Sequence, residues 1–118
     1  MLPKKNIAAE TLNQLAETSC REFAQRPSLS LAFQQPITYG ELFDLLIRTA
    51  SVLKNMGIRK KDKVAILAEN SPNWAIAYLA TIRLGAIAVP ILPDFPESDV
   101  RHILTDAKAK ILFTTQRQ

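Results

Sequence analysis

The stretch "VAILAENSPNWAIAYLATIRLGAIAVPIL", residues 64–92, contains two continuous apolar runs on either side of a segment with helical character. The runs at 64–68 and 86–92 show no alternation of apolar and polar residues, which is typical of strands covered on both faces. Residues 72–84 are apolar almost all round, which predicts a helix buried on several sides, and Gly85 is placed to end it. The stretch therefore predicts a strand–helix–strand unit with parallel strands and a right-handed crossover.

The segments before this unit predict two amphipathic helices and a hairpin. Residues 11–25 have helical spacing, with Thr11 and Gln14 at capping-box positions, and residues 29–33 with Ile37 read as two short strands at a sheet edge. Thr38 and Glu41 repeat the capping-box spacing and open a second helix, which Gly57 ends, with Ile58 folding back on Leu53. The expected apolar stripe of this helix is Leu42, Leu45, Leu46, Thr49, Leu53 and Met56.

After the unit, Ser98 can cap a short helix and residues 110–115 form a last strand. Strands that alternate with helices at this spacing imply a largely parallel sheet. The fold class expected is α/β: a partial doubly wound, largely parallel sheet with flanking helices and a small N-terminal hairpin. The crossovers provide helices for one face and only part of the other, so we also expect bare sheet surface, an open edge at 110–115 and self-association.

The turn "ENSPNW", residues 69–74, is the first place to look for a phosphate site, because a helix start favours anions. Phosphate-binding loops of known type use several glycines, however, and Gly40, Gly57 and Gly85 all have structural roles at helix ends. Ser71 before Pro72 is therefore interpreted as a helix N-cap.

No catalytic residue, cofactor-binding residue or metal ligand is expected in this chain. The candidate carboxylates lie in predicted turns or first turns of helices, where solvation and the helix dipole explain them: Glu69, Asp94, Glu97, Asp99 and Asp106. Cys20 and His102 are single residues of their kind, without a nucleophile or ligand pattern around them.

Composition bounds the remaining classes. A chain of 118 residues with 47% hydrophobic and 22% charged residues allows one globular domain at most. The first ten residues lack the apolar core of a signal peptide and no segment is long and apolar enough for a membrane span, so a cytoplasmic protein is expected. The net charge of +4 includes basic clusters at Lys4-Lys5 and residues 59–63, but no aromatic residue lies near the latter, so no nucleic-acid partner is expected.

The order of five short motifs resembles the N-terminal part of the adenylate-forming enzymes. The motifs are TYGEL (38–42), DKVA (62–65), NSP (70–72), GAIAVP (85–90) and DAKAKILF (106–113). The segment that follows Val89-Pro90, Ile91 to Phe95, resembles long-chain fatty acyl-CoA ligases more than peptide-synthetase domains, which typically have Leu-Asp-Pro there. Lys61 departs from the glycine that many relatives have before Asp62, which suggests a slightly different turn.

This resemblance implies a function for a longer parent protein. The family activates a carboxylic acid with ATP and Mg²⁺ to an acyl-adenylate and pyrophosphate, then transfers the acyl group to coenzyme A, so a fatty acid and CoA are the implied substrates. In the family, the phosphate loop and catalytic lysine follow the matched region. We therefore expect residues 1–118 to be an incomplete N-terminal subdomain, without the rest of the large domain and the C-terminal domain, and to be inactive and without cofactors when alone.

Two alternatives remain open. One is a free-standing, non-catalytic binding or assembly module that keeps the subdomain. The other is a fragment of an amino-acid-activating adenylation domain, which shares the chemistry but not the substrate.

Overall fold

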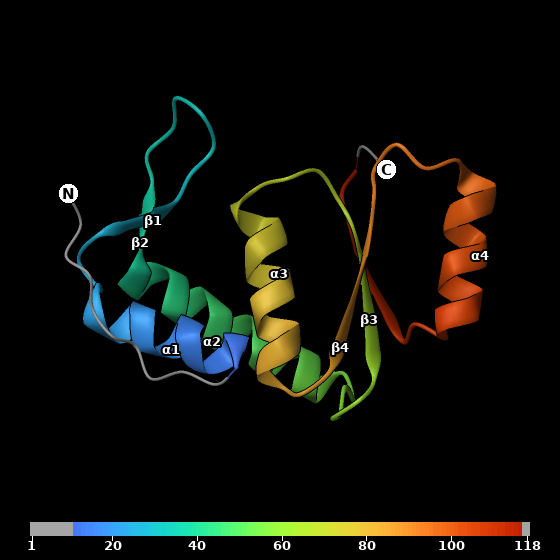
Figure 1. Ribbon diagram of the computed structural model, residues 1–118, viewed down its shortest axis with the longest axis horizontal. Coiled ribbons are helices and arrows are strands. Elements are labelled where there is room, and N and C mark those ends of the chain that lie inside the picture. Colours follow the sequence, from blue (N-terminus) through green and yellow to red (C-terminus); the bar gives the residue numbers. More distant parts are fainter. Residues whose placement is uncertain (1–10, 117–118) are drawn as a thin grey trace.

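The computed structural model describes residues 11–116, and the Lys4-Lys5 cluster lies outside them. The elements follow in the order α1 (Leu12–Glu22), β1 (Pro27–Leu29), β2 (Ile37–Thr38), α2 (Tyr39–Asn55), β3 (Lys63–Leu67), α3 (Pro72–Arg83), β4 (Ile87–Ile91), α4 (Glu97–Ala107) and β5 (Ile111–Thr114). Figure 1 shows α3 on one side of the main sheet and α4 on the other, with α1 and α2 packed below and beside α3.

The main sheet has the strand order β4-β3-β5, and both pairings are parallel. The chain moves from β3 to β4 on one side, then passes back beyond β3 to reach β5 on the other side. Since right-handed crossovers in opposite directions place their helices on opposite faces, α3 and α4 cover different faces of the sheet (Figure 1). The predicted α/β class with a parallel, doubly wound sheet and flanking helices is confirmed.

The central strand β3 is buried on both faces, as its continuous apolar run predicts. Val64, Ala65 and Ile66 are 0% exposed. On one face, Val64 packs in a cluster with Leu53 of α2 and with residues of α3, and on the other face Ala65 packs with Ile91 and the apolar side of α4. Both layers of the core therefore meet at this strand.

Strand β4 is less buried than its apolar sequence predicts. Ile87 is 45% exposed and Leu92, just after the strand, is 63% exposed, whereas Ala86 and Ile91 are buried. The reason is that β4 pairs only with β3 and forms an edge of the sheet. Pro90, which has no N–H to donate, lies within this strand, and proline is tolerated in a sheet mainly at an edge.

The predicted hairpin exists, but its first strand is displaced from 29–33. Strand β1 covers Pro27–Leu29 and pairs antiparallel with β2. Leu31 and Phe33 lie in the loop, where Phe33 is fully exposed. The β1–β2 pairing is short because β2 contains only two residues before α2 begins. The first residue of α2 extends the contact, since the Tyr39 N–H donates to the Arg26 carbonyl at 2.9 Å and so aligns β1 with the start of α2.

Two of the predicted helix caps are confirmed in full. Thr11 and Gln14 form both hydrogen bonds of a capping box at the start of α1, and Thr38 and Glu41 do the same at α2. The predicted Ser98 cap is wrong. Helix α4 begins at Glu97, so Ser98 is already helical, and no side chain caps this helix.

The buried stripe of α2 differs from the predicted one. Its buried residues are Leu42, Leu46, Ala50 and Leu53. Leu45 is 37% exposed and Met56 60% exposed, and the predicted Thr49 is only partly buried, with its hydroxyl donating to the Leu45 carbonyl. The stripe is rotated because α2 packs against α3 as well as the sheet, and Ala50 belongs to the same buried cluster as Ala80 of α3.

The turn between α2 and β3 is held by a set of long-range and local hydrogen bonds. Gly57 takes the left-handed conformation at φ 95°, and Ile58 N–H bonds back to Leu53 carbonyl at 3.0 Å, as predicted. Asp62 accepts from the backbone N–H of Arg59 at 2.7 Å and from Lys110 Nζ at 3.2 Å. These bonds, the Arg59 N–H first, lower the pKa of Asp62 and tie the turn to the start of β5.

Lys61 itself has a left-handed backbone, with φ 70°. Its N–H donates to the Gly85 carbonyl at 2.9 Å, which joins this turn to the end of α3. Lys61 therefore occupies a conformation that glycine favours, at the position where the resemblance leads us to expect a glycine.

Replacing Lys61 by glycine should raise the free energy of unfolding by about 0.5–1 kcal/mol. Relief of the left-handed strain of a non-glycine residue, ~1–2 kcal/mol, exceeds the added entropy loss of glycine, ~0.5–1 kcal/mol. Urea unfolding followed by circular dichroism measures the difference. Lys60→Gly is the matched control: Lys60 has no positive φ, so the same change there should lower stability, and equal effects of the two variants would contradict the strain at Lys61.

Candidate functional site

The carboxyl ends of the parallel strands are the first place to examine, because ligands of open α/β sheets bind outside these ends where the strand order reverses. In this sheet the chain runs from β3 through α3 to β4 on one side, then from β4 through α4 past β3 to β5 on the other side, so the strand order reverses at β3 and places β5 beside it. The loop 68–71 after β3 and the residues after β5 border this position.

Glu69 and Thr115 meet across the reversal point. The Thr115 hydroxyl donates to Glu69 Oε2 at 2.9 Å, which joins the ends of β3 and β5. From its position in the sequence, Glu69 is expected to be a solvated turn carboxylate, and the 46-residue separation from Thr115 gives no local signal of this contact. A carboxylate paired with a hydroxyl here ties the two strand ends together.

The loop between β3 and α3 forms a helix cap, as the sequence predicts. Ser71 Oγ accepts a hydrogen bond from the Trp74 N–H at 3.2 Å, and Pro72 is the first residue of α3. One of the free N–H groups that could hold an anion is therefore already used by the protein.

The other candidate carboxylates do not converge. Glu97 pairs with Arg101 one turn along α4 at 2.6 Å, and Asp99 shares the same first turn. Asp106 lies in the last turn of α4, not in a turn or first turn as expected, so the helix dipole does not stabilise it there. Within residues 11–116, no three or more His, Cys, Asp and Glu side chains are grouped so that they could hold a metal ion.

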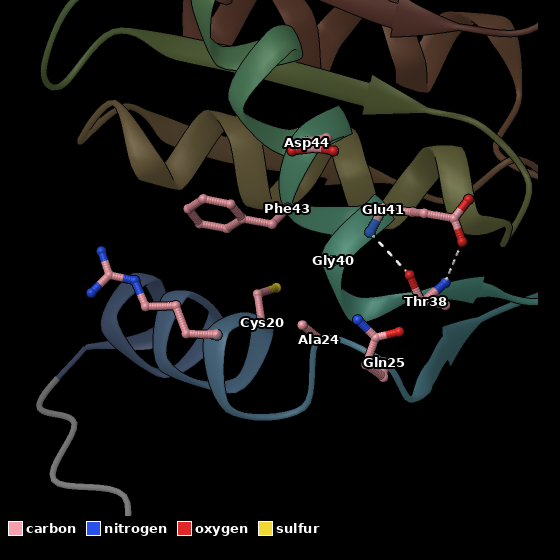
Figure 2. Close-up of a pocket in the computed structure, with 9 residues that line it drawn as sticks. Cys20, Ala24, Gln25, Thr38, Gly40, Glu41, Phe43 and Asp44 are labelled. Atoms are coloured by element: carbon pink, nitrogen blue, oxygen red, sulfur yellow. Dashed lines mark hydrogen bonds between the residues drawn. The ribbon is translucent and has the colours of Figure 1, made fainter.

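Cys20 lies beside a cavity of about 440 Å³ between α1 and the start of α2, shown in Figure 2. The lining residues are Cys20, Arg21, Ala24, Gln25, Thr38, Gly40, Glu41, Phe43 and Asp44. Cys20 is 3% exposed, and burial raises the pKa of its thiol. A buried, protonated thiol is a poor nucleophile, which agrees with a structural role.

Two polar residues of this cavity, Thr38 and Glu41, are committed to the capping box of α2. The dashed lines in Figure 2 mark the capping box, in which Thr38 Oγ1 accepts from the Glu41 N–H and Glu41 Oε1 accepts from the Thr38 N–H, both at 3.1 Å. The Gly40 N–H donates to the Ala24 carbonyl at 2.9 Å, and a methyl group at Gly40 would lie 3.2 Å from that oxygen. Gly40 therefore allows the close approach that seats α2 against the end of α1.

Ser71→Ala should lower the free energy of unfolding by about 1 kcal/mol, within the ~0.5–2 kcal/mol range for loss of an N-cap. Ser71→Asp should retain most of the stability, because a carboxylate also accepts the N–H and suits the helix dipole. Ser98→Ala is the control, since Ser98 makes no cap bond in α4. A Ser71→Ala variant as stable as Ser98→Ala in chemical denaturation would show that the cap bond contributes nothing.

Comparison with known proteins identifies a family that matches this chain. The profile of the AMP-binding enzyme family matches residues 16–118. Among curated proteins, surfactin synthase subunit 1 of Bacillus subtilis (strain 168) is 36% identical over 103 residues, which cover 87% of this chain and 3% of that protein. Oxalate–CoA ligase of Arabidopsis thaliana is 31% identical over 109 residues, covering 92% of this chain and 21% of the ligase.

Solved structures of similar proteins have the same fold as this chain. The N-terminal subdomain of Klebsiella oxytoca NpsA in complex with 3-hydroxyanthranilyl-AMSN has a TM-score of 0.82 and 32% identity, and the match covers 90% of this chain and 27% of that one. The N-terminal domain of FACL13 from Mycobacterium tuberculosis, bound to an inhibitor, has a TM-score of 0.84 and 27% identity, with coverage of 97% and 28%. The chain thus spans about a quarter of these structures and 3–21% of the two curated relatives. With its parallel sheet and its family profile in agreement, the chain belongs to the AMP-binding enzymes.

Proposed function

We propose that this chain is the N-terminal part of an ATP-dependent enzyme that activates a carboxylic acid as an acyl-adenylate. The observation that carries the proposal is the family match over residues 16–118 together with a fold similar to the N-terminal subdomains of NpsA and FACL13. In this reading the 118 residues are an incomplete N-terminal subdomain whose sheet and helices support sites formed by the rest of the protein.

The described residues do not themselves fit ATP or Mg²⁺. The turn at 69–74 contains no glycine, its Ser71 oxygen is used as a cap, and no acidic cluster suits a divalent cation. We therefore assign both groups to the part of the parent enzyme beyond this chain. When bound there, ATP would supply the adenylyl group that converts the carboxylate into a reactive mixed anhydride.

The acid activated by the parent has two candidates of comparable support. A long-chain fatty acid, with transfer to CoA, is favoured by the sequence after Val89-Pro90 and is consistent with CoA ligases among the relatives, such as oxalate–CoA ligase and 3-hydroxybenzoate–CoA ligase. An amino acid is favoured by the peptide synthases among the relatives, including surfactin synthase subunit 1 and tyrocidine synthase 2. The second fits at least as well as the first.

The purified chain should show no ATP–pyrophosphate exchange above a mock preparation with either a fatty acid or an amino acid. Positioning and electrostatic stabilisation account for most catalysis of this kind, and the phosphate loop and lysine that would supply them are not among these residues. Exchange by the 118 residues alone would overturn the scaffold role.

The parent protein separates the remaining candidates. A Ser/Thr/Gly-rich loop with a lysine in the coding sequence after Gln118 supports the enzyme, whereas a stop codon supports the free-standing binding or assembly module. Exchange assays of the longer protein with a panel of fatty and amino acids then identify the substrate class.

Self-association of the isolated chain is a second proposal, and the structure changes its basis. Helix α4 packs over β3 and β4, so the second sheet face is less bare than the sequence predicts. What stays open is the free edge of β5, where Leu112 is 38% exposed, and a stripe on α2 in which Val52 is 55% exposed and Met56 60% exposed. Antiparallel pairing of two β5 edges would keep both copies of α2 on the same face of a continuous sheet, so that the two stripes meet.

Light scattering over a dilution series should therefore show a dimer or larger species. Met56→Glu should shift the chain toward monomer, because a charge in the shared apolar contact would be desolvated. Phe33→Glu is the control: it removes a more exposed apolar side chain, in the β1–β2 loop far along the chain from the proposed contact, and should leave the assembly unchanged. A monomer at high micromolar concentration would refute the proposal and favour the module that covers its own surface.

Cytoplasmic location remains a prediction from the sequence. Of the helices formed by residues 11–116, none is both long enough and apolar enough to cross a membrane.

A further inference from the structure

The charges of the main sheet are separated by end. The amino ends of the strands and the neighbouring helix ends carry Lys54, Arg59, Lys60, Lys61, Lys63, Arg83, Lys108 and Lys110. The acidic residues among them are Asp62, Asp106 and Glu17 of α1, whose carboxylate lies 3.8 Å from the Arg83 guanidinium. The carboxyl ends carry Glu69, Asp94, Glu97 and Asp99, with Arg101 paired to Glu97. A surface of one dominant sign attracts ligands of the opposite sign, so the amino end favours an anion.

A cavity of about 560 Å³ opens within this basic end. It lies where α2 and α3 both finish, and its lining residues are Lys54, Gly57, Ile58, Arg59, Lys60, Arg83 and Leu84. No carboxylate is among them. A volume in the range of ~300–1,000 Å³ suits a small molecule, and the buried Ile58 forms part of the apolar lining.

Helix dipoles explain only part of this basic cluster. The C-terminal ends of α2 and α3 carry partial negative charge, which basic residues of the last turn, Lys54 and Arg83, can balance. At the end of α2, Lys110 also balances this negative charge, because its Nζ donates to the Gly57 carbonyl at 2.8 Å; it donates to Asp62 as well. Arg59 and Lys60 come after the helix and are not needed for this balance.

Three of the four lining cations form no side-chain ion pair in the described part of the chain, although the charge of Arg59 also acts on the nearby Asp62 and lowers its pKa. Arg83 is engaged elsewhere: its guanidinium lies 5.5 Å from the Phe43 ring centroid and 3.8 Å from Glu17 Oε2. Lys54, Arg59 and Lys60 form no ion pair with any residue of 11–116 and are exposed. Their charge is thus available to a ligand.

The positions of Arg59 and Lys60 are set by the backbone around them. The Arg59 N–H is bonded to Asp62, which closes the turn. The Lys60 stem packs directly over Gly85, since a methyl group there would lie 3.1 Å from Lys60 Cγ. Gly85 at φ 73° is therefore required both to end α3 and to admit this stem. A cation held on an ordered turn loses less entropy when it binds an anion.

We propose that this cavity binds the phosphate groups of a small phosphorylated molecule through Lys54, Arg59 and Lys60. A multiply charged phosphate matches several converging cations better than a single carboxylate does, and Arg59 offers the paired N–H donors that phosphate oxygens accept. The site lies at the end of the sheet opposite Ser71 and the Glu69–Thr115 contact, and it is independent of the proposed adenylation chemistry.

The test uses the whole chain and inorganic pyrophosphate as the probe. Titration in low-salt buffer, followed by two-dimensional NMR of backbone amides, should give saturating shifts centred on residues 57–60 and 84–85. Arg59→Gln and Lys60→Gln should each weaken binding by about threefold or more, in line with loss of one exposed charge contact. Lys108→Gln is the matched control, because Lys108 lies at the same end of the sheet but outside the cavity.

Three outcomes would overturn the site. Amide shifts that increase linearly with pyrophosphate concentration and occur near all lysines would indicate only a diffuse attraction by positive charge. Equal weakening of pyrophosphate binding by Lys108→Gln and Lys60→Gln would indicate the same. If a hexaglutamate peptide shifted the same amide signals and bound more tightly than pyrophosphate, the ligand would be an acidic protein segment and not a phosphorylated molecule. Unchanged unfolding midpoints of the two cavity variants establish that weakening comes from lost contacts and not from lost folding.

Discussion

The position of β3 between β4 and β5 is the constraint on which the rest of the structure depends. It is the first strand of the parallel sheet and also the central one, so the chain moves from it to β4 on one side and then passes back beyond it to β5 on the other. Right-handed crossovers then require α3 and α4 to lie on opposite faces. This is why Val64 and Ala65, adjacent in sequence, each reach 0% exposure in different clusters. Burial on both faces needs side chains without polar groups, which the run 64–68 provides.

The two ends of this sheet have different roles because helix ends and strand ends coincide there. At the carboxyl ends, helices begin, and acidic residues and the Ser71 cap suit their positive dipoles. At the amino ends, helices finish, and basic residues suit the negative dipoles. The turn at Asp62 links both crossovers at that end: it bonds Lys110 of the segment before β5, and the Ile87 N–H of β4 donates to its carbonyl at 2.7 Å. One carboxylate-centred turn thus positions all three strands.

Features that depend on neighbours in sequence could be predicted from the sequence. The capping boxes at Thr11 and Thr38, the glycine at the end of α2 and the continuous run of β3 are confirmed, because each rests on bonds within a few residues or on the period of one element. The errors come from tertiary context. The buried stripe of α2 includes Ala50 in place of Thr49 because α3 crosses there. Pro90 is a signal that β4 is an edge strand, and the prediction, which rested on the apolar run 86–92, did not use it.

Contacts between distant segments had no sequence signal at all, and these include both candidate sites. The pairing of Glu69 with Thr115 follows from β3 and β5 being neighbours in the sheet, which the order of elements does not reveal. The basic cavity likewise requires α2 and α3 to end beside each other, which brings Lys54 and Arg59 near Leu84. That this chain contributes no catalytic residue remains a prediction from the sequence. Catalytic groups in open parallel sheets come from the ends of several strands. At this end of the sheet, the Thr115–Glu69 hydrogen bond joins the segments after β5 and β3, and Ser71 accepts a hydrogen bond from an N–H of α3, so these polar groups already stabilise the fold.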